Sequence, residues 1–171
     1  MNYWWVNQNQ THRHEIAGEY MWSPKFSKNN RRNPYYDNMV KVSPGDLVYS
    51  FIDTKIQYIG IIQSRGFSYL KPGEFGSEGD TWDDEGWKVR VIYCPLENII
   101  RPKDHIDQLR PFLPDKYSPL QKDSGNGPQN SLSLISSQYS SLAKFAFPGN
   151  FPSICSFDRT YLSRRLFVFH P

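Results

Sequence analysis

The chain has 171 residues, of which 38% are hydrophobic, 22% charged and 16% aromatic. This composition excludes extended disorder, and the length fits one domain, or one domain with a tail. No apolar run reaches the ~18 residues of a membrane helix, and the first residues lack the basic and apolar regions of a signal peptide. Two cysteines far apart in the sequence, Cys94 and Cys155, make no disulfide framework. We therefore expect a soluble, cytoplasmic protein that does not associate with a membrane.

The net charge of +3 is unevenly distributed, because two units lie beyond Pro152. The nearly neutral body before that residue argues against a protein held on nucleic acid mainly by phosphate contacts. Two local runs of like charge could still form binding patches. Residues 74–85 hold six acids without a base, and residues 25–32 hold four bases without an acid. Each run is also typical of a solvated loop.

The first part of the chain predicts short elements of mixed type. A β-prone, aromatic strand covers Tyr3–Asn7, and Thr11 is placed to cap a helix that continues to about Tyr20. A loop is expected over Met21–Arg32. An Asn-Pro pair then supplies the cap and the first position of a short helix, Pro34–Val40.

A β-hairpin is predicted in the middle of the chain. Leu47–Ile52 and Lys55–Gln63 are rich in β-branched and aromatic residues, and only two residues separate them. Within the second run, Gly60 marks a bulge or a close backbone approach. From Gly66 to Glu85 we expect a long irregular loop, which in a compact domain usually has a function.

The remaining elements complete a sheet. Trp87–Tyr93 alternates apolar and polar residues as a half-buried strand does, Glu97–Ile100 follows as a short strand, and Pro102–Leu109 reads as a helix. A weak helical pattern covers Ser137–Phe147. We expect an α+β fold, a small curved and mostly antiparallel β-barrel with helices at its edges. The domain would cover residues 1–147, and residues 148–171 would form a tail or a truncated linker.

No catalytic constellation is visible in the sequence. The nucleophile elbow, the phosphate loop, the zinc-protease helix motif and the paired-cysteine motif are all absent. His12 and His14 diverge if they lie on a helix, and His105 lacks a second cluster of metal ligands. We therefore expect no metal, no cofactor and no catalytic residue in this chain, and whether it belongs to an enzyme stays open.

Two tryptophans fall outside any strand periodicity. Trp22 stands at the start of the basic run, and Trp82 stands in the long loop. Aromatic planes beside the amides of Asn7, Gln8 and Asn9 can hold a flat heterocycle. Stacking on an aromatic ring contributes ~1–3 kcal/mol per base, and amides both donate and accept hydrogen bonds at a base edge. The structural alternative is that both indoles only pack beneath loops.

A set of short segments occurs in a fixed order along the chain: YWWVNQNQ, YMWSPK, RNPYYDNM, SPGDLVYSF, IGII, GWKVRV and RPKDHID. Together, over roughly residues 2–135, they resemble the EVE-type domain of the PUA-like superfamily. More narrowly, they resemble the N-terminal domain of modification-dependent restriction endonucleases of the EVE–HNH kind. The resemblance implies a curved β-barrel with an aromatic cage that accepts one extruded, modified base. The cage residues it implies are Trp22, Trp82, Asn7, Gln8, Asn9 and Ser23.

The leading hypothesis is therefore a module that binds double-stranded DNA and reads methyl- or hydroxymethylcytosine by base flipping. Lys25, Arg31, Arg32 and Lys103 would contact the phosphates. The resembled family continues into an HNH nuclease whose histidine/asparagine cluster this chain lacks, so a nuclease would be supplied by another domain or subunit. The alternatives are a YTH-like reader of modified RNA, a nuclease subunit and a small-ligand sensor.

Overall fold

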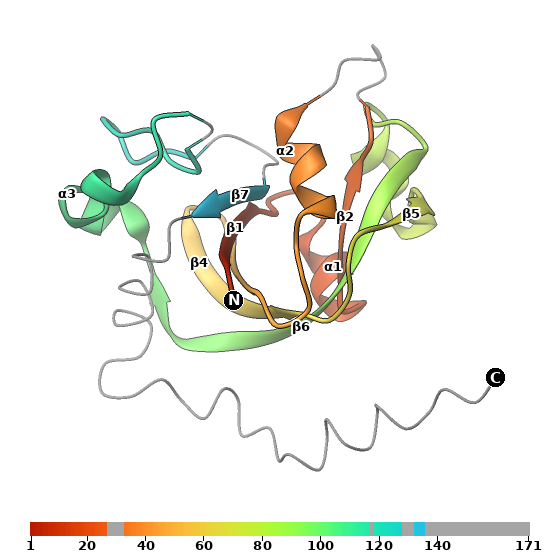
Figure 1. Ribbon diagram of the computed structural model, residues 1–171, viewed down its shortest axis with the longest axis horizontal. Coiled ribbons are helices and arrows are strands. Elements are labelled where there is room, and N and C mark those ends of the chain that lie inside the picture. Colours follow the sequence, from red (N-terminus) through yellow and green to blue (C-terminus); the bar gives the residue numbers. More distant parts are fainter. Residues whose placement is uncertain (27–32, 117, 128–131, 136–171) are drawn as a thin grey trace.

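The computed structural model, drawn in Figure 1, describes residues 1–26, 33–116, 118–127 and 132–135. The predicted helix over 137–147 and the predicted tail over 148–171 lie outside these residues. In chain order the elements are β1 (Tyr3–Asn7), α1 (His12–Ala17), β2 (Tyr20–Pro24), α2 (Pro34–Asp37), η1 (Asn38–Val40), β3 (Leu47–Ile52), β4 (Lys55–Ile62), β5 (Phe67–Leu70), η2 (Gly73–Gly79), β6 (Glu85–Ile100), η3 (Pro102–His105), α3 (Ile106–Leu109), η4 (Arg110–Phe112) and β7 (Leu132–Ile135), where η denotes a 3₁₀ helix.

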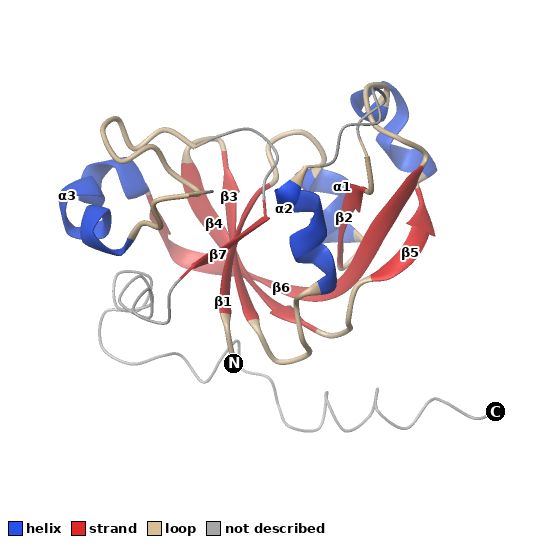
Figure 2. Cartoon of the chain, turned by 45° about the horizontal axis from the view of Figure 1, so that its top comes forward, coloured by secondary structure: helices blue, strands red, loops and turns tan. Residues whose placement is uncertain are grey.

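The strands form one curved sheet in the spatial order β2-β6-β4-β3-β1-β7, and β5 also pairs with β6. Only β1 and β3 run parallel among the described strand pairs, and the other pairs are antiparallel. Figures 1 and 2 show the sheet curling into a half-barrel, with short helices around it. The prediction of a small α+β fold on a curved, mostly antiparallel sheet is confirmed.

The central strands bury both of their faces, and β1 is buried along its whole length. Trp4 contributes to a core on one face, where Met39 of η1 covers the sheet. Trp5 contributes to a second core on the other face, which Leu109 and Leu120 cover from the segment after β6. Alternation along one strand therefore serves two cores, and the predicted strand over Tyr3–Asn7 is confirmed.

The predicted hairpin is confirmed, because β3 and β4 pair antiparallel. At its turn, Asp53 and Thr54 have φ of 47° and 67°, as a two-residue type I′ turn requires. Gly60 marks a close approach, as predicted. A Cβ at that position would lie 2.5 Å from Val91 Cγ1 and 2.6 Å from Val48 Cγ1, so glycine keeps these strands packed.

The N-terminal helix is shorter than predicted, and the loop predicted after it begins with a strand. Gly18 follows the last helical residue, and Glu19 adopts a left-handed φ of 54°, which turns the chain out of the helix. The next five residues form β2 by pairing with β6. This pairing joins segments more than sixty residues apart, so no local sequence pattern predicts it.

The predicted loop over Gly66–Glu85 is also wrong in part, because it contains β5 and η2. In addition, the two strands predicted over Trp87–Tyr93 and Glu97–Ile100 are parts of one strand, β6, which has 16 residues. Pro95 sits inside it opposite Tyr58, next to a register shift in β4, where a missing N–H donor is tolerated.

Asp46 ties the turn before β3 to the N-terminus of the chain. Its carboxylate accepts hydrogen bonds from the backbone N of Asn2 at 2.7 Å, from the backbone N of Ser43 at 3.0 Å and from Trp4 Nε1 at 3.0 Å. Burial raises the pKa of Asp46, but the hydrogen bonds from Trp4, Asn2 and Ser43 outweigh it and hold that pKa below its ordinary value of 3.8.

Replacing Asp46 with Ala would leave these donors without their acceptor, and a buried donor left unpaired costs ~1–3 kcal/mol. We expect Asp46→Ala to lower the free energy of unfolding by about 3 kcal/mol, measured by urea denaturation at pH 7. Because the pKa is lower in the folded state, the part of this contribution that depends on the ionised carboxylate should begin to be lost as the pH falls below about 4 and should be gone below the folded-state pKa. The exposed turn variant Asp53→Asn is the control, and equal stability of the two variants would refute the anchoring role.

Candidate functional site

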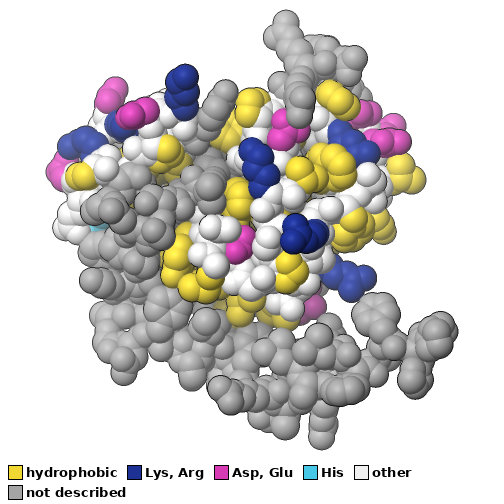
Figure 3. Space-filling model, in the orientation of Figure 1, with side chains coloured by type: hydrophobic (Ala, Val, Ile, Leu, Met, Phe, Trp, Pro, Cys, Tyr) yellow, Lys and Arg dark blue, Asp and Glu magenta, His cyan; other side chains and the backbone are white. Residues whose placement is uncertain are grey.

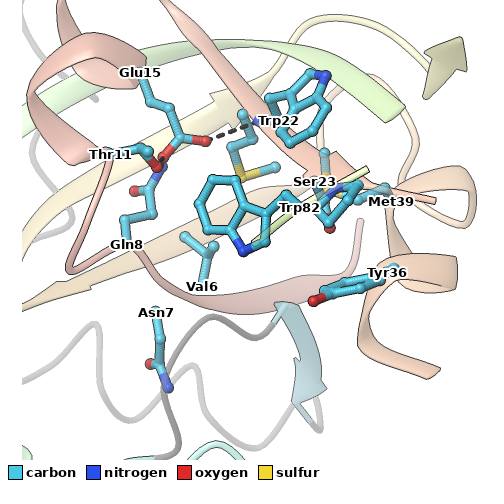
Figure 4. A pocket seen from close by; sticks show the side chains of 12 residues that line it. Val6, Asn7, Gln8, Thr11, Glu15, Trp22, Ser23, Tyr36, Met39 and Trp82 are labelled. Atoms are coloured by element: carbon cyan, nitrogen blue, oxygen red, sulfur yellow. Dashed lines mark hydrogen bonds between the residues drawn. The ribbon is translucent and has the colours of Figure 1, made fainter. Parts of the chain in front are cut away.

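A pocket lies between the end of β1, β2, α2 and the segment before β6 (Figure 4). Its cavity measures about 40 Å³. Apolar and aromatic side chains surround most of it, and polar side chains from α1 and from the chain after β1 close one end. The residues that line it are Val6, Asn7, Gln8, Thr11, Glu15, Met21, Trp22, Ser23, Pro24, Tyr36, Met39 and Trp82.

Trp22 enters the pocket from β2, so its predicted loop position is wrong. Its indole lies over Gly86 of β6. A Cβ on residue 86 would come within 2.2 Å of the ring, so only glycine leaves room for the indole. The indole Nε1 donates to the backbone O of Tyr69 at 3.3 Å. The ring is therefore held from two sides, by the surface of β6 and by a hydrogen bond to β5.

Trp82 lies between η2 and β6, and it packs directly on Trp22. The two ring centroids are 5.9 Å apart, with an angle of 34° between the planes. Phe75 touches both indoles, with centroid distances of 5.7 Å to Trp22 and 6.0 Å to Trp82. These three residues and Tyr20 form the aromatic cluster. Trp22 and Trp82 are only 6% and 9% exposed, so the prediction that they stand outside any core is wrong.

The two predicted cage walls are thus in contact with each other. Aromatic rings whose centroids are ~4.5–7 Å apart touch directly, so no base fits between Trp22 and Trp82 in this arrangement. The cavity of about 40 Å³ exceeds the roughly 10–15 Å³ that admits a water molecule. Pockets that hold drug-sized ligands measure roughly 300–1,000 Å³. In this structure the pocket is therefore closed to a base.

Glu15 closes the polar end of the pocket, and its side chain is buried. Its Oε2 accepts hydrogen bonds from Thr11 Oγ1 at 2.9 Å and from Gln8 Nε2 at 3.1 Å, and its Oε1 accepts from the backbone N of Trp22 at 2.8 Å. Burial raises the pKa of Glu15 to about 7, although the three hydrogen bonds act in the opposite direction. One carboxyl thus connects α1, the end of β1 and β2.

Gln8 holds this carboxyl in place. Its Nε2 donates to Tyr93 Oη at 2.9 Å as well as to Glu15, and its Oε1 accepts from Ser50 Oγ. Tyr93 in turn donates to the backbone O of Tyr20 at 3.3 Å. Both N–H groups of the Gln8 amide are therefore used inside the protein, and Gln8 acts as a support for Glu15.

The structure brings most of the predicted base-binding residues together. Those that line the pocket are Trp22, Trp82, Asn7, Gln8 and Ser23. Asn9 is not among the lining residues, because its Oδ1 accepts from the backbone N of Asp53 at 3.0 Å, in the hairpin turn. The Asn7 side chain is buried, and its Oδ1 accepts from Trp5 Nε1 at 2.6 Å.

The two predicted phosphate-binding residues that the structure describes, Lys25 and Lys103, belong to different parts of the fold. Lys25 follows the pocket residue Pro24, but it pairs with Glu85 at 3.1 Å. Lys103 lies on η3, beside α3 at the opposite end of β6 from β2 (Figure 2). On the face drawn in Figure 3, the described Lys and Arg side chains are interspersed with acids and form no single patch. Arg31 and Arg32 lie outside the described residues.

Sequence reasoning missed several residues of the pocket. Glu15 follows Thr11 by four positions, and this spacing places both side chains on one face of a helix, so the signal was present. Tyr36 and Met39 belong to the segment RNPYYDNM, but nothing in the local sequence predicts that they approach β2. Nothing in the sequence distinguishes Phe75 within the predicted loop, although it is 2% exposed and contacts both tryptophans.

The described part of the chain holds no group of three His, Cys, Asp or Glu side chains that could bind a metal ion. Within the same residues, no helix combines the length and the apolar character needed to cross a membrane.

No family model and no curated protein matches this chain. Solved structures of similar fold include Rpa0253 from Rhodopseudomonas palustris, with 15% identity and a TM-score of 0.52 over 85% of this chain and 92% of that one. PSPTO5229 from Pseudomonas syringae has 12% identity and a TM-score of 0.50 over 85% and 99%. Atu2648 from Agrobacterium tumefaciens has 14% identity and a TM-score of 0.50 over 89% and 96%. At these identities the similarity shows the fold alone.

The raised pKa of Glu15 predicts a pH dependence of stability. Between its ordinary pKa of 4.5 and about 7, the folded protein keeps a proton that the unfolded chain has lost. The free energy of unfolding should therefore fall by about 3 kcal/mol as the pH rises through this interval, and level off above it. Denaturation between pH 4.5 and 8 should show this slope in the wild type and lose it in Glu15→Gln. The exposed variant Glu97→Gln should retain it, and a retained slope in Glu15→Gln would contradict the assignment.

Proposed function

We propose that this chain binds double-stranded DNA and reads a modified cytosine, methylated or hydroxymethylated, that is flipped out of the duplex into the pocket at Trp22. The observation that carries the proposal is the convergence of two tryptophans and a buried polar network on one pocket of a small curved sheet. A nuclease domain of the HNH kind, in another domain or subunit, would use this module for its specificity.

The energetics of flipping favour such a site. Extruding a base costs a few kcal/mol, and stacking on one aromatic ring returns ~1–3 kcal/mol. A methyl or hydroxymethyl group adds apolar surface that Val6 and Met39 can cover. Recognition of the modification would then rest on burial against these side chains, and not on phosphate contacts.

Entry of a base requires the two indoles to separate, and the structure favours Trp82 as the one that moves. Trp22 is fixed by its seat on Gly86 and by the hydrogen bond to Tyr69. Among the described residues, Trp82 Nε1 has no hydrogen-bond partner, and Trp82 lies outside the helices and strands. A base stacked on Trp22 would take the space that the Trp82 indole fills in Figure 4.

The basic run is attached next to the pocket at both of its ends. Pro24 and Tyr36 line the pocket, and Lys28, Arg31 and Arg32 come between them in the chain. Lysine and arginine at the rim of a base pocket are suited to contact the phosphates beside the flipped nucleotide.

A binding panel tests the proposal. Fluorescence anisotropy with otherwise identical duplexes that carry one cytosine, methylcytosine, hydroxymethylcytosine or methyladenine should give the tightest binding for a modified cytosine. Single-stranded RNA with a methylated base should bind more weakly. Equal affinity for modified and unmodified duplexes would refute the proposal, and a preference for the RNA would support a reader of modified RNA instead.

Trp82→Leu should weaken binding of the preferred duplex by ~1–3 kcal/mol, the contribution of one stacked base face. Phe75→Leu is the matched control, because Phe75 belongs to the same aromatic cluster but does not line the pocket. Both variants should lose stability in thermal denaturation, since both residues are buried. If they weaken binding equally, the effect comes from the packing of the cluster, and Trp82 does not contact the base.

The double variant Arg31→Ala/Arg32→Ala should weaken modified and unmodified duplexes by the same factor. Each lost phosphate contact should also reduce the slope of log K against log salt by about 0.9. Titrations at several salt concentrations measure both effects. A loss of discrimination with an unchanged salt slope would show instead that these arginines read the base.

A further inference from the structure

The Glu15 carboxylate, at the polar end of the pocket, has one hydrogen-bonding position left over, and it is an acceptor. A carboxylate offers about four lone-pair sites. Among the described residues, Glu15 receives three hydrogen bonds, two on Oε2 and a single one, from the backbone N of Trp22, on Oε1. Oε1 can therefore accept one more hydrogen bond from a group inside the pocket.

The side-chain donors of Gln8 and Thr11, next to Glu15, are already used. Both N–H groups of Gln8 are bound, to Glu15 and to Tyr93, and the hydroxyl of Thr11 donates to Glu15. Above its pKa of about 7, Glu15 is an ionised carboxylate, which accepts hydrogen bonds and donates none. A ligand that reaches this end of the pocket must therefore present an N–H or O–H donor to Glu15.

We infer that Glu15 selects bases with an exocyclic amino group, such as cytosine and its 5-substituted forms, over bases that carry an oxo group at the same position. This inference rests on the proposed function and specifies its ligand. The 4-amino group of cytosine donates to carboxylates, and Asp and Glu are the side chains that accept from it. The 4-oxo group of thymine would instead face Glu15 Oε1 as a second acceptor, and both would stay unpaired in a buried site.

Methylcytosine and thymine provide a suitable comparison, because both carry the same 5-methyl group and differ at position 4. Duplexes with either base opposite guanine would be compared by anisotropy with the wild-type protein at a pH of about 8.5, where Glu15 is ionised. The T·G mismatch opens more easily than a paired base, so the comparison is biased against the inference. We expect the wild type to bind the methylcytosine duplex at least about tenfold more tightly.

Glu15→Gln replaces one oxygen by an N–H donor that can pair with an oxo group, so the ratio of the two affinities should fall about tenfold. Ser50→Ala is the matched control. It removes the buried hydrogen bond that Ser50 donates to Gln8, and Ser50 does not line the pocket. The ratio of the two affinities should therefore stay that of the wild type. A purely structural role of Glu15 would change both affinities together and leave their ratio unchanged.

The possible outcomes separate the two claims. If the wild type binds no modified duplex better than the unmodified one, the proposed function fails, and this inference fails with it. If the wild type prefers modified bases but binds methylcytosine and thymine equally, the inference fails while the proposed function stands. That second comparison uses only the wild-type protein, so it decides the matter even if Glu15→Gln does not fold. A ratio unchanged in a folded Glu15→Gln also overturns the inference.

Discussion

One buried carboxyl fixes the geometry of the pocket. Glu15 is the point at which α1, the chain after β1 and β2 meet, through hydrogen bonds to Thr11, Gln8 and the backbone of Trp22. A buried carboxylate is stable only when donors surround it, and this requirement sets where each of those segments can lie. The register of β2, and with it the seat of the Trp22 indole on Gly86, follows from the same requirement.

The sequence predicts best those parts of the fold that local chemistry determines. The hairpin of β3 and β4 follows from β-branched runs on either side of a two-residue turn, and α2 begins where Asn33 caps it. What the sequence does not reveal is pairing between distant segments. β2 is a strand only because β6 lies beside it, and the single length of β6 depends on a bulge that accommodates Pro95. The same limit affected the site, since Trp22 and Trp82 were identified as a pair but their mutual contact was not.

Because the pocket is closed, the apparent affinity for any ligand includes the cost of opening it. Whatever enters must displace the contact between Trp22 and Trp82, whose rings also pack on Phe75. The apparent dissociation constant then equals the intrinsic one divided by the fraction of molecules that are open. A substitution that loosens this contact but keeps both tryptophans would therefore tighten binding, because a larger fraction of molecules would already be open.

The pairing of β1 with β7 bears on how the chain folds. Tyr3 lies opposite Ile135, so the first strand receives its second neighbour from the far end of the described chain. At roughly 5–20 residues per second, the ribosome needs on the order of ten seconds to make the intervening segment. During that time one hydrogen-bonding edge of a strand rich in tryptophan is unprotected, and such edges are templates for aggregation. Nascent or shortened chains that end before β7 should therefore depend on chaperones more than the complete domain does, and contacts of such long range also make folding slow.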